Sequence, residues 1–117
     1  MPLFSRRRRA QPADAAPQGR GARAETLEYL QAFVTSRGGV EAYVEPRTNG
    51  TPTTLMLVAT DGEWTRRKVP DERTAGALAR ELGIPVYDVQ RTGYPQRVRD
   101  WNARQRIERA RRAAERS

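Results

Sequence analysis

Residues 55–59, Leu-Met-Leu-Val-Ala, are apolar at every position and lie shortly before the pair Asp61-Gly62. An apolar run without alternation indicates a strand that is covered on both faces. Asp-Gly is a strong signal for a two-residue hairpin, because a type I′ turn needs positive φ angles at both central positions. We therefore expect a hairpin with these opposing pairs: Thr60 and Glu63, Ala59 and Trp64, Leu57 and Arg66, and Leu55 and Lys68.

The second strand of this hairpin carries charge on both faces. Its residues 64–69 read Trp-Thr-Arg-Arg-Lys-Val. Such a strand belongs at or near a sheet edge, where charge opposes pairing between molecules and arginine stems cover apolar neighbours. A second interpretation stays open, in which Arg66, Arg67 and Lys68 form a platform beside Trp64 that contacts an anion.

Amphipathic segments precede the hairpin. Apolar residues at helical spacing predict a helix over residues 25–37, which Gly38-Gly39 ends. Residues 40–45 alternate between apolar and polar side chains, which predicts a half-buried strand. Its polar side, with Glu41 and Glu45, is expected to face water.

A second helix, a fourth strand and a last helix follow the hairpin. Asp71 suits a helix N-cap, and Gly83 suits the C′ position, with Ile84 completing a Schellman ending. Residues 84–89, Ile-Pro-Val-Tyr-Asp-Val, predict a short strand. Pro95 suits the first turn of the last helix.

Two stripes on the last helix point in different directions. Val98 and Trp101 share one face, and the opposite face carries Ala103, Ile107, Ala110 and Ala114. One straight helix cannot bury both stripes against the same core. We expect its start to dock on the sheet and its arginine-rich remainder to project or fray.

These segments predict an α+β fold in a single domain, with the order α-β-β-β-α-β-α. An antiparallel three-strand meander and a fourth strand form the sheet, and the helices pack on it. Residues 1–24, rich in Arg, Pro and Ala, are expected to be a disordered tail. Residues 25–102 form the core, and residues 103–117 form an arginine-rich helical extension.

The net charge of +8 on 117 residues is concentrated at the two ends of the sequence. Residues 1–24 hold six arginines and one aspartate, and residues 95–117 hold eight arginines and three acids. The middle holds eight basic and ten acidic residues. This layout suits a nearly neutral folded body with two basic terminal segments that bind a polyanion. Arginine is abundant throughout, so a merely solvated basic surface is the competing interpretation.

The leading hypothesis is a small non-catalytic interaction protein that binds nucleic acid or a ribonucleoprotein. The candidate contact residues are Arg6, Arg7, Arg8, Arg9, Trp64, Arg66, Arg67, Lys68, Arg97, Arg99, Trp101, Arg104, Arg106, Arg109, Arg111 and Arg112. Trp101 would stack a base or, alternatively, anchor the last helix.

Two other partners stay open. Leu3 and Phe4 beside Arg6–Arg9 would allow association with an anionic membrane surface. The stripe around Ile107 would allow a protein partner or a homo-oligomer.

The composition argues against several chemistries. The chain has no Cys and no His, which removes thiol and imidazole chemistry and the usual zinc ligands. Glu41 and Glu45 could form an acid pair, or a weak metal site with Asp61 or Asp88. We expect no catalytic residue, no metal site and no cofactor, and a cytoplasmic location.

Four segments resemble those of a small actinobacterial family of unassigned function. They are Gly39–Thr48 (GVEAYVEPRT), Asp61–Arg67 (DGEWTRR), Gly83–Asp88 (GIPVYD) and Gly93–Arg97 (GYPQR). The resemblance covers about Glu25 to Arg104, and it implies a bacterial cytosolic origin.

The order of elements is also similar to the core of restriction-endonuclease-like proteins. Those enzymes hold a divalent metal with an acid on one strand and an acid-x-lysine motif on the next. Here Thr65 stands where the lysine would follow Glu63, and Arg66 stands where the acid would precede Lys68. This resemblance implies the fold without its active site, as a degenerate nuclease-fold protein.

Residues 25–82 also follow the order of a double-stranded-RNA-binding domain. That domain uses lysines at the start of its second helix. Asp71 and Glu72 occupy this place here and would repel RNA.

Overall fold

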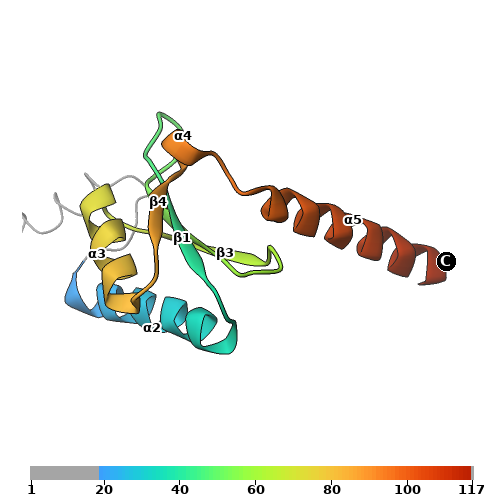
Figure 1. Ribbon diagram of the computed structural model, residues 1–117, viewed down its shortest axis with the longest axis horizontal. Helices are drawn as coiled ribbons and strands as arrows, with labels where there is room; N and C mark the ends of the chain where they lie inside the picture. Colours follow the sequence, from blue (N-terminus) through green and yellow to red (C-terminus); the bar gives the residue numbers. More distant parts are fainter. Residues whose placement is uncertain (1–18, 117) are drawn as a thin grey trace, which may run out of the picture.

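The computed structural model describes residues 19–116 (Figure 1). Its elements are α2 (Arg20–Ser36), β1 (Glu41–Glu45), β2 (Thr54–Val58), β3 (Trp64–Lys68), α3 (Glu72–Leu82), β4 (Val86–Asp88), the single turn α4 (Val89–Thr92) and α5 (Gln96–Arg116). The predicted α+β class and the predicted order of helices and strands are confirmed.

The four strands form one mixed sheet in the order β3-β2-β1-β4. β1, β2 and β3 make the predicted antiparallel meander, and β4 adds to β1 in parallel. β2 lies inside the sheet and is buried along most of its length, as its apolar run predicts. β3 lies at an edge, as its charge on both faces predicts.

The predicted register of the β2–β3 hairpin is wrong by one residue. The observed opposing pairs are Val58 and Trp64, Leu57 and Thr65, Met56 and Arg66, Leu55 and Arg67, and Thr54 and Lys68. Arg66 therefore shares a sheet face with Met56, whereas the prediction placed it opposite Leu57.

The cause is the connection between the two strands, which is longer than a type I′ turn. The Gly62 amide donates to the Ala59 carbonyl at 3.0 Å, and the Ala59 amide donates to the Glu63 carbonyl at 2.8 Å. Within this connection only Gly62 has a positive φ, 95°. A type I′ turn needs two such residues, so a tight turn followed by a glycine bulge takes its place.

α2 begins at Arg20 rather than at Glu25, so residues 20–24 are helical although their composition suggested a disordered tail. Arginine and alanine are good helix formers, and this first part of α2 also meets α3 through an ion pair between Arg23 and Glu81. Residues 1–18 of the predicted tail lie outside the described residues.

Both helices α2 and α3 cover one face of the sheet. This core consists of Leu30 and Phe33 from α2, Ala75, Leu78, Ala79 and Leu82 from α3, and Val40, Ala42, Val44, Leu55, Leu57, Ala59 and Val69 from the sheet and its connections. The inward side chains of β1 are the ones that the alternation predicted.

The predicted ends of α3 are confirmed. Asp71 caps the helix by accepting the Thr74 amide at 2.8 Å. Gly83 has a φ of 71°, in the left-handed region, and the Ile84 amide donates to the Ala79 carbonyl at 3.3 Å. This is the bond pattern of a Schellman ending.

The start of α5 covers the other face of the sheet. Val98 is buried with Tyr43, Met56 and Val58, and Trp64 packs against them. Beyond this contact α5 runs away from the sheet as one continuous helix (Figure 1).

Candidate functional site

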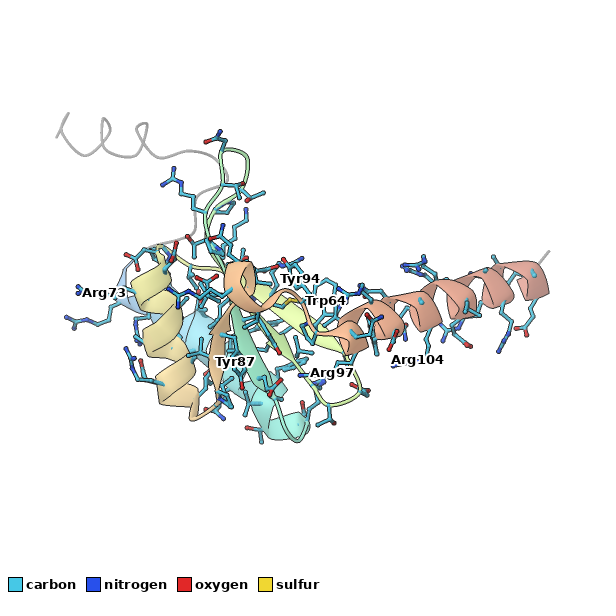
Figure 2. All side chains as sticks on the ribbon, turned by 45° about the horizontal axis from the view of Figure 1, so that its top comes forward. Trp64, Arg73, Tyr87, Tyr94, Arg97 and Arg104 are labelled. Atoms are coloured by element: carbon cyan, nitrogen blue, oxygen red, sulfur yellow. The ribbon has the colours of Figure 1, made fainter. Side chains whose placement is uncertain are left out.

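The predicted anion-binding residues fall into three groups, two of which the structure describes (Figure 2). Arg6–Arg9 lie outside the described residues. Trp64, Arg66, Arg67 and Lys68 lie on β3. The remaining arginines and Trp101 lie on α5, and Figure 2 shows Trp64 beside the start of that helix.

Two of the three cations on β3 have partners within the molecule. Arg66 donates from Nε and Nη2 to the two carboxylate oxygens of Glu45 at 2.8 and 2.6 Å. The Arg67 guanidinium carbon lies 3.6 Å from the centroid of the Tyr29 ring, in cation–π geometry. Lys68 is exposed and has no polar partner among the described residues. β3 therefore presents less free positive charge than its sequence indicates.

Glu45 is buried, and the prediction that it faces water is wrong. It is 9% exposed, and it accepts hydrogen bonds from the hydroxyls of Thr54 and Tyr94 as well as from Arg66. Burial alone would raise the pKa of Glu45. The hydrogen bonds from Arg66, Thr54 and Tyr94 outweigh it and hold the pKa below its ordinary value. The pKa of Tyr94 is raised above its ordinary value. Burial is the largest cause, and the hydrogen bond to Glu45 is the second.

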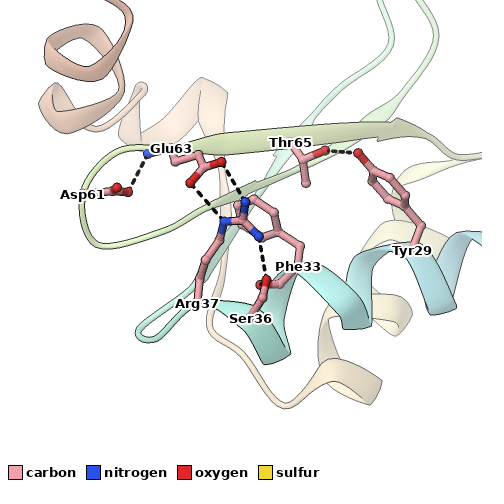
Figure 3. Close-up of polar contacts among 7 residues, drawn as sticks. All are labelled: Tyr29, Phe33, Ser36, Arg37, Asp61, Glu63 and Thr65. Atoms are coloured by element: carbon pink, nitrogen blue, oxygen red, sulfur yellow. Dashed lines mark hydrogen bonds and ion pairs between the residues drawn. The ribbon is translucent and has the colours of Figure 1, made fainter. Parts of the chain in front are cut away.

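The tip of the hairpin is tied to the end of α2 (Figure 3). Arg37 donates from Nε and Nη2 to the Glu63 carboxylate at 3.1 and 2.7 Å, and from Nη1 to Ser36 Oγ at 2.6 Å. Its guanidinium carbon lies 4.2 Å from the centroid of the Phe33 ring. Asp61 accepts the Glu63 amide at 2.9 Å. Both acids of the hairpin are thus held in local structure.

The first turns of α5 are fixed against the hairpin. Arg97 donates from Nε to the Ala59 carbonyl at 3.0 Å and from Nη2 to Glu41 Oε1 at 2.6 Å. A Cβ atom on Gly62 would lie 2.0 Å from the Arg97 carbonyl oxygen and 2.9 Å from Trp101 Cβ. The two backbones therefore approach as closely as only glycine allows.

A hydrogen bond between side chains completes this anchor. The indole Nε1 of Trp64 donates to Asn102 Oδ1 at 2.9 Å, and the Arg66 guanidinium carbon lies 4.9 Å from the centroid of the Trp64 ring. No local pattern points to Asn102, because its partner Trp64 is distant in the chain.

Two further arginines near the start of α5 have local partners. Arg104 donates from Nη2 to the Asp61 carbonyl at 2.8 Å. Arg99 donates to Gln96 Oε1, one turn earlier, at 2.7 and 3.1 Å. The predicted contact residues Arg97, Arg99 and Arg104 are therefore at least partly occupied in holding the helix.

The arginines beyond Gln105 are presented to solvent. Within the described residues, none of the guanidinium groups of Arg106, Arg109, Arg111, Arg112 and Arg116 bonds to the folded body. Arg111 and Arg112 lie 3.8 and 4.0 Å from Glu108 of the same helix, with side chains 65% and 66% exposed. Such exposed pairs are weak.

The docking face of α5 becomes basic where the helix leaves the sheet. At ~100° per residue, Arg109, Arg112 and Arg116 share the face that carries Val98 nearer the start. The stripe of Ala103, Ile107, Ala110 and Ala114 lies on the other side, where Ile107 is 58% exposed. The structure therefore separates the basic face of this helix from its apolar stripe.

Among residues 19–116, no group of three His, Cys, Asp or Glu side chains is placed to hold a metal ion. In the same range no helix combines the length and the apolar composition needed to cross a membrane. Comparison of the chain with protein-family models, with curated proteins and with solved structures finds no match. The family resemblances therefore stay predictions.

Proposed function

We propose that this protein is a small interaction protein whose helix α5 binds the phosphate backbone of nucleic acid, free or in a ribonucleoprotein, without reading its sequence. One observation carries the proposal. Arg66 of β3 and Arg97 at the start of α5 are bonded to carboxylates of the body. Among the described residues, the arginines beyond Gln105 make no bond to the body, and Arg111 and Arg112 form only weak, exposed pairs with Glu108.

A helix of this kind suits a phosphate polymer in its dimensions. The part beyond Gln105 extends about 16 Å at 1.5 Å per residue. Duplex DNA presents one charge per about 1.7 Å of axis, so about nine phosphates lie along that length. Arginine pairs with phosphate oxygens through two parallel hydrogen bonds, and it releases condensed counterions as it does so.

The same helix suits a membrane surface less well. A helix that lies in a membrane interface carries large apolar side chains along one face. Beyond Gln105, Ile107 is accompanied by alanines on that side of α5. The apolar area is small against five arginines, which favours a polyanion in water over lipid.

The bonding of the carboxylates favours a binding role for this protein over a catalytic role. Glu41, Glu45 and Glu63 are each bonded to an arginine, Arg97, Arg66 and Arg37 respectively. The pKa of Glu45 is held below its ordinary value by its hydrogen bonds, which makes this carboxylate a weak general base. We therefore propose a non-catalytic role.

A chain that ends at Gln105 tests the proposal. It should bind a fluorescein-labelled RNA duplex of arbitrary sequence about tenfold or more weakly than the full chain, because it lacks five phosphate contacts. Its melting temperature should be unchanged, since the removed arginines do not bond to the body. A parallel chain that starts at Gly19 measures the contribution of Arg6–Arg9. Equal affinity of the full chain and the chain ending at Gln105 would contradict the proposal.

A further inference from the structure

One edge of the sheet, formed by β3, has free main-chain groups. The Ala59 amide bonds to the Glu63 carbonyl, and the Val69 amide bonds to the Thr53 carbonyl. The odd-numbered residues around β3 therefore direct their main chain toward β2. The outward groups belong to Trp64, Arg66 and Lys68, and no described residue forms a hydrogen bond with them.

A groove lies at the Lys68 end of this edge. It has a volume of about 1160 Å³ and is open to solvent. β3 lines it from Arg66 to Lys68, the first turns of α2 line it with Ala22 and Thr26, and the β1–β2 loop contributes Thr48. A second hollow of about 400 Å³ shares Ala22, Thr26 and Lys68 with it.

An edge strand beside a helix is the arrangement in which proteins take up an extended peptide as an added strand. The main-chain bonds supply affinity without regard to sequence. The side chains along the groove then decide which peptide fits. In this protein the charged side chains of the groove are the cations Arg66, Arg67 and Lys68 and the carboxylates Glu25 and Glu45.

The charge of the groove distinguishes between possible occupants. Arg66 is neutralised by Glu45, and Glu25 offsets one further cation, so three cations against two carboxylates leave the groove with one positive charge. Arg67 has only an aromatic partner, and Lys68 has no polar partner among the described residues. A second copy of β3 would bring like charges face to face, which is destabilising. Residues 1–18 contain Arg6–Arg9 and have the same sign. A segment with carboxylates complements the edge.

We propose that β3 takes up an extended acidic segment of a partner protein as a fifth strand, in the groove between β3 and α2. The outward amides and carbonyls of Trp64, Arg66 and Lys68 pair with the segment. Carboxylates of the segment meet Arg67 on the α2 side and Lys68 on the other side. This site is separate from the arginines of α5, so the two binding activities are independent.

A short peptide with pairs of adjacent glutamates separated by threonine is the probe, because adjacent side chains of a strand point to opposite faces and can meet both Arg67 and Lys68. On titration into the full chain, the amide resonances of Trp64, Arg66 and Lys68 should shift, and hydrogen exchange at these amides should slow. Only one edge of an added strand faces β3. N-methylation of one alternate set of peptide amides should therefore abolish binding, and N-methylation of the other set should leave it intact.

Charge reversal in the protein supplies the second readout. The variant Arg67→Glu with Lys68→Glu should bind the peptide about tenfold or more weakly. The matched variant, Arg106→Glu with Arg109→Glu, changes the net charge equally and should bind it as the original chain does. That matched variant should instead lose affinity for RNA, which separates this inference from the proposed function.

Several results would overturn the inference. They are absence of peptide binding, equal binding of the two N-methylated peptides, and equal effects of the two charge-reversal variants. Two others identify a different occupant. Protection of the outward amides that rises with protein concentration indicates a second copy, and protection that disappears when residues 1–18 are deleted indicates that segment.

Discussion

At the scale of single residues, Glu45 connects β1 with three other parts of the fold. Its carboxylate at the end of β1 binds Thr54 of β2, Arg66 of β3 and Tyr94 before α5. The folded pKa of Glu45 is below its ordinary value. The unfolded chain therefore binds this proton more readily, and the ionised carboxylate stabilises the fold above the unfolded pKa, about 4.3. This stabilisation is lost as the pH falls through the folded pKa.

The substitution Glu45→Gln should lower the free energy of unfolding by about 1–3 kcal/mol at pH 7, because it leaves Arg66 without its charged partner. The difference from the original chain should shrink as the pH falls through the lowered pKa of Glu45, where Glu45 itself becomes protonated. Urea denaturation at several pH values measures both effects.

Glu28→Gln is the matched control for this prediction. Glu28 lies on α2, exposed and without a polar partner among the described residues. Its loss should change the free energy of unfolding by less than about 0.5 kcal/mol. If Glu45→Gln behaved like Glu28→Gln at pH 7, the buried carboxylate would not stabilise the fold as argued.

The alternation of β1 predicted the residues on the α2 side but not the burial of Glu45. Val40, Ala42 and Val44 follow from a local pattern, because strand side chains alternate between faces. The opposite face of β1 is covered by Arg66, Tyr94 and α5, which are distant from β1 in the sequence. In an alternating sequence, a polar residue that faces water cannot be distinguished from a polar residue that an arginine covers.

At the scale of elements, the hairpin tip and the start of α5 act as one joint. Gly62 has a φ of 95°, and its Cα faces the backbone of Arg97. An added Cβ would be strained by this φ and would also collide with α5. The substitution Gly62→Ala should therefore lower the free energy of unfolding by about 2 kcal/mol or more.

Gly50→Ala serves as the control, because nothing lies within 4 Å of the Cβ position there and its φ is ordinary. It should change stability by less than about 0.5 kcal/mol. Limited proteolysis gives a second readout, since loosening of the joint should expose α5 to cleavage in the Gly62→Ala chain. Equal stability of the two variants would contradict the close packing of Gly62.

The Asp-Gly pair located this hairpin correctly, but it did not determine the register. Glycine at position 62 satisfies either a type I′ turn or a longer connection that ends in a bulge. The alternatives differ by one residue in the pairing. The observed connection places Gly62 against α5. The local sequence contains no sign of this contact.

At the scale of the whole molecule, Arg37, Arg66 and Arg97 are paired with carboxylates of the body, whereas the arginines of α5 beyond Gln105 make no bond to it among the described residues. The sequence showed where arginine is abundant, and that part of the site was predictable. It did not show which arginines are bonded internally. Arg97 and Arg106 look alike in sequence, but Arg97 meets Glu41 and Arg106 projects from the fold. Tertiary structure alone separates the anchoring set from the free set.

Figure 2 shows that α3, with Arg73, lies on the opposite side of the sheet from the projecting part of α5. This separation allows two variants with the same net charge. One is Arg109→Gln, Arg112→Gln and Arg116→Gln on the basic face of α5. The other is Arg73→Gln, Arg80→Gln and Arg91→Gln on the body.

The dependence of RNA affinity on salt concentration, measured for these two variants and the original chain, tests the central claim most directly. Each lost phosphate contact reduces the slope of log K against log salt by about 0.7–0.9. The α5 variant should therefore have a slope shallower by about 2–3, and the body variant should keep the original slope. Equal slopes for the two variants would show that net charge, and not the projecting helix, governs the interaction.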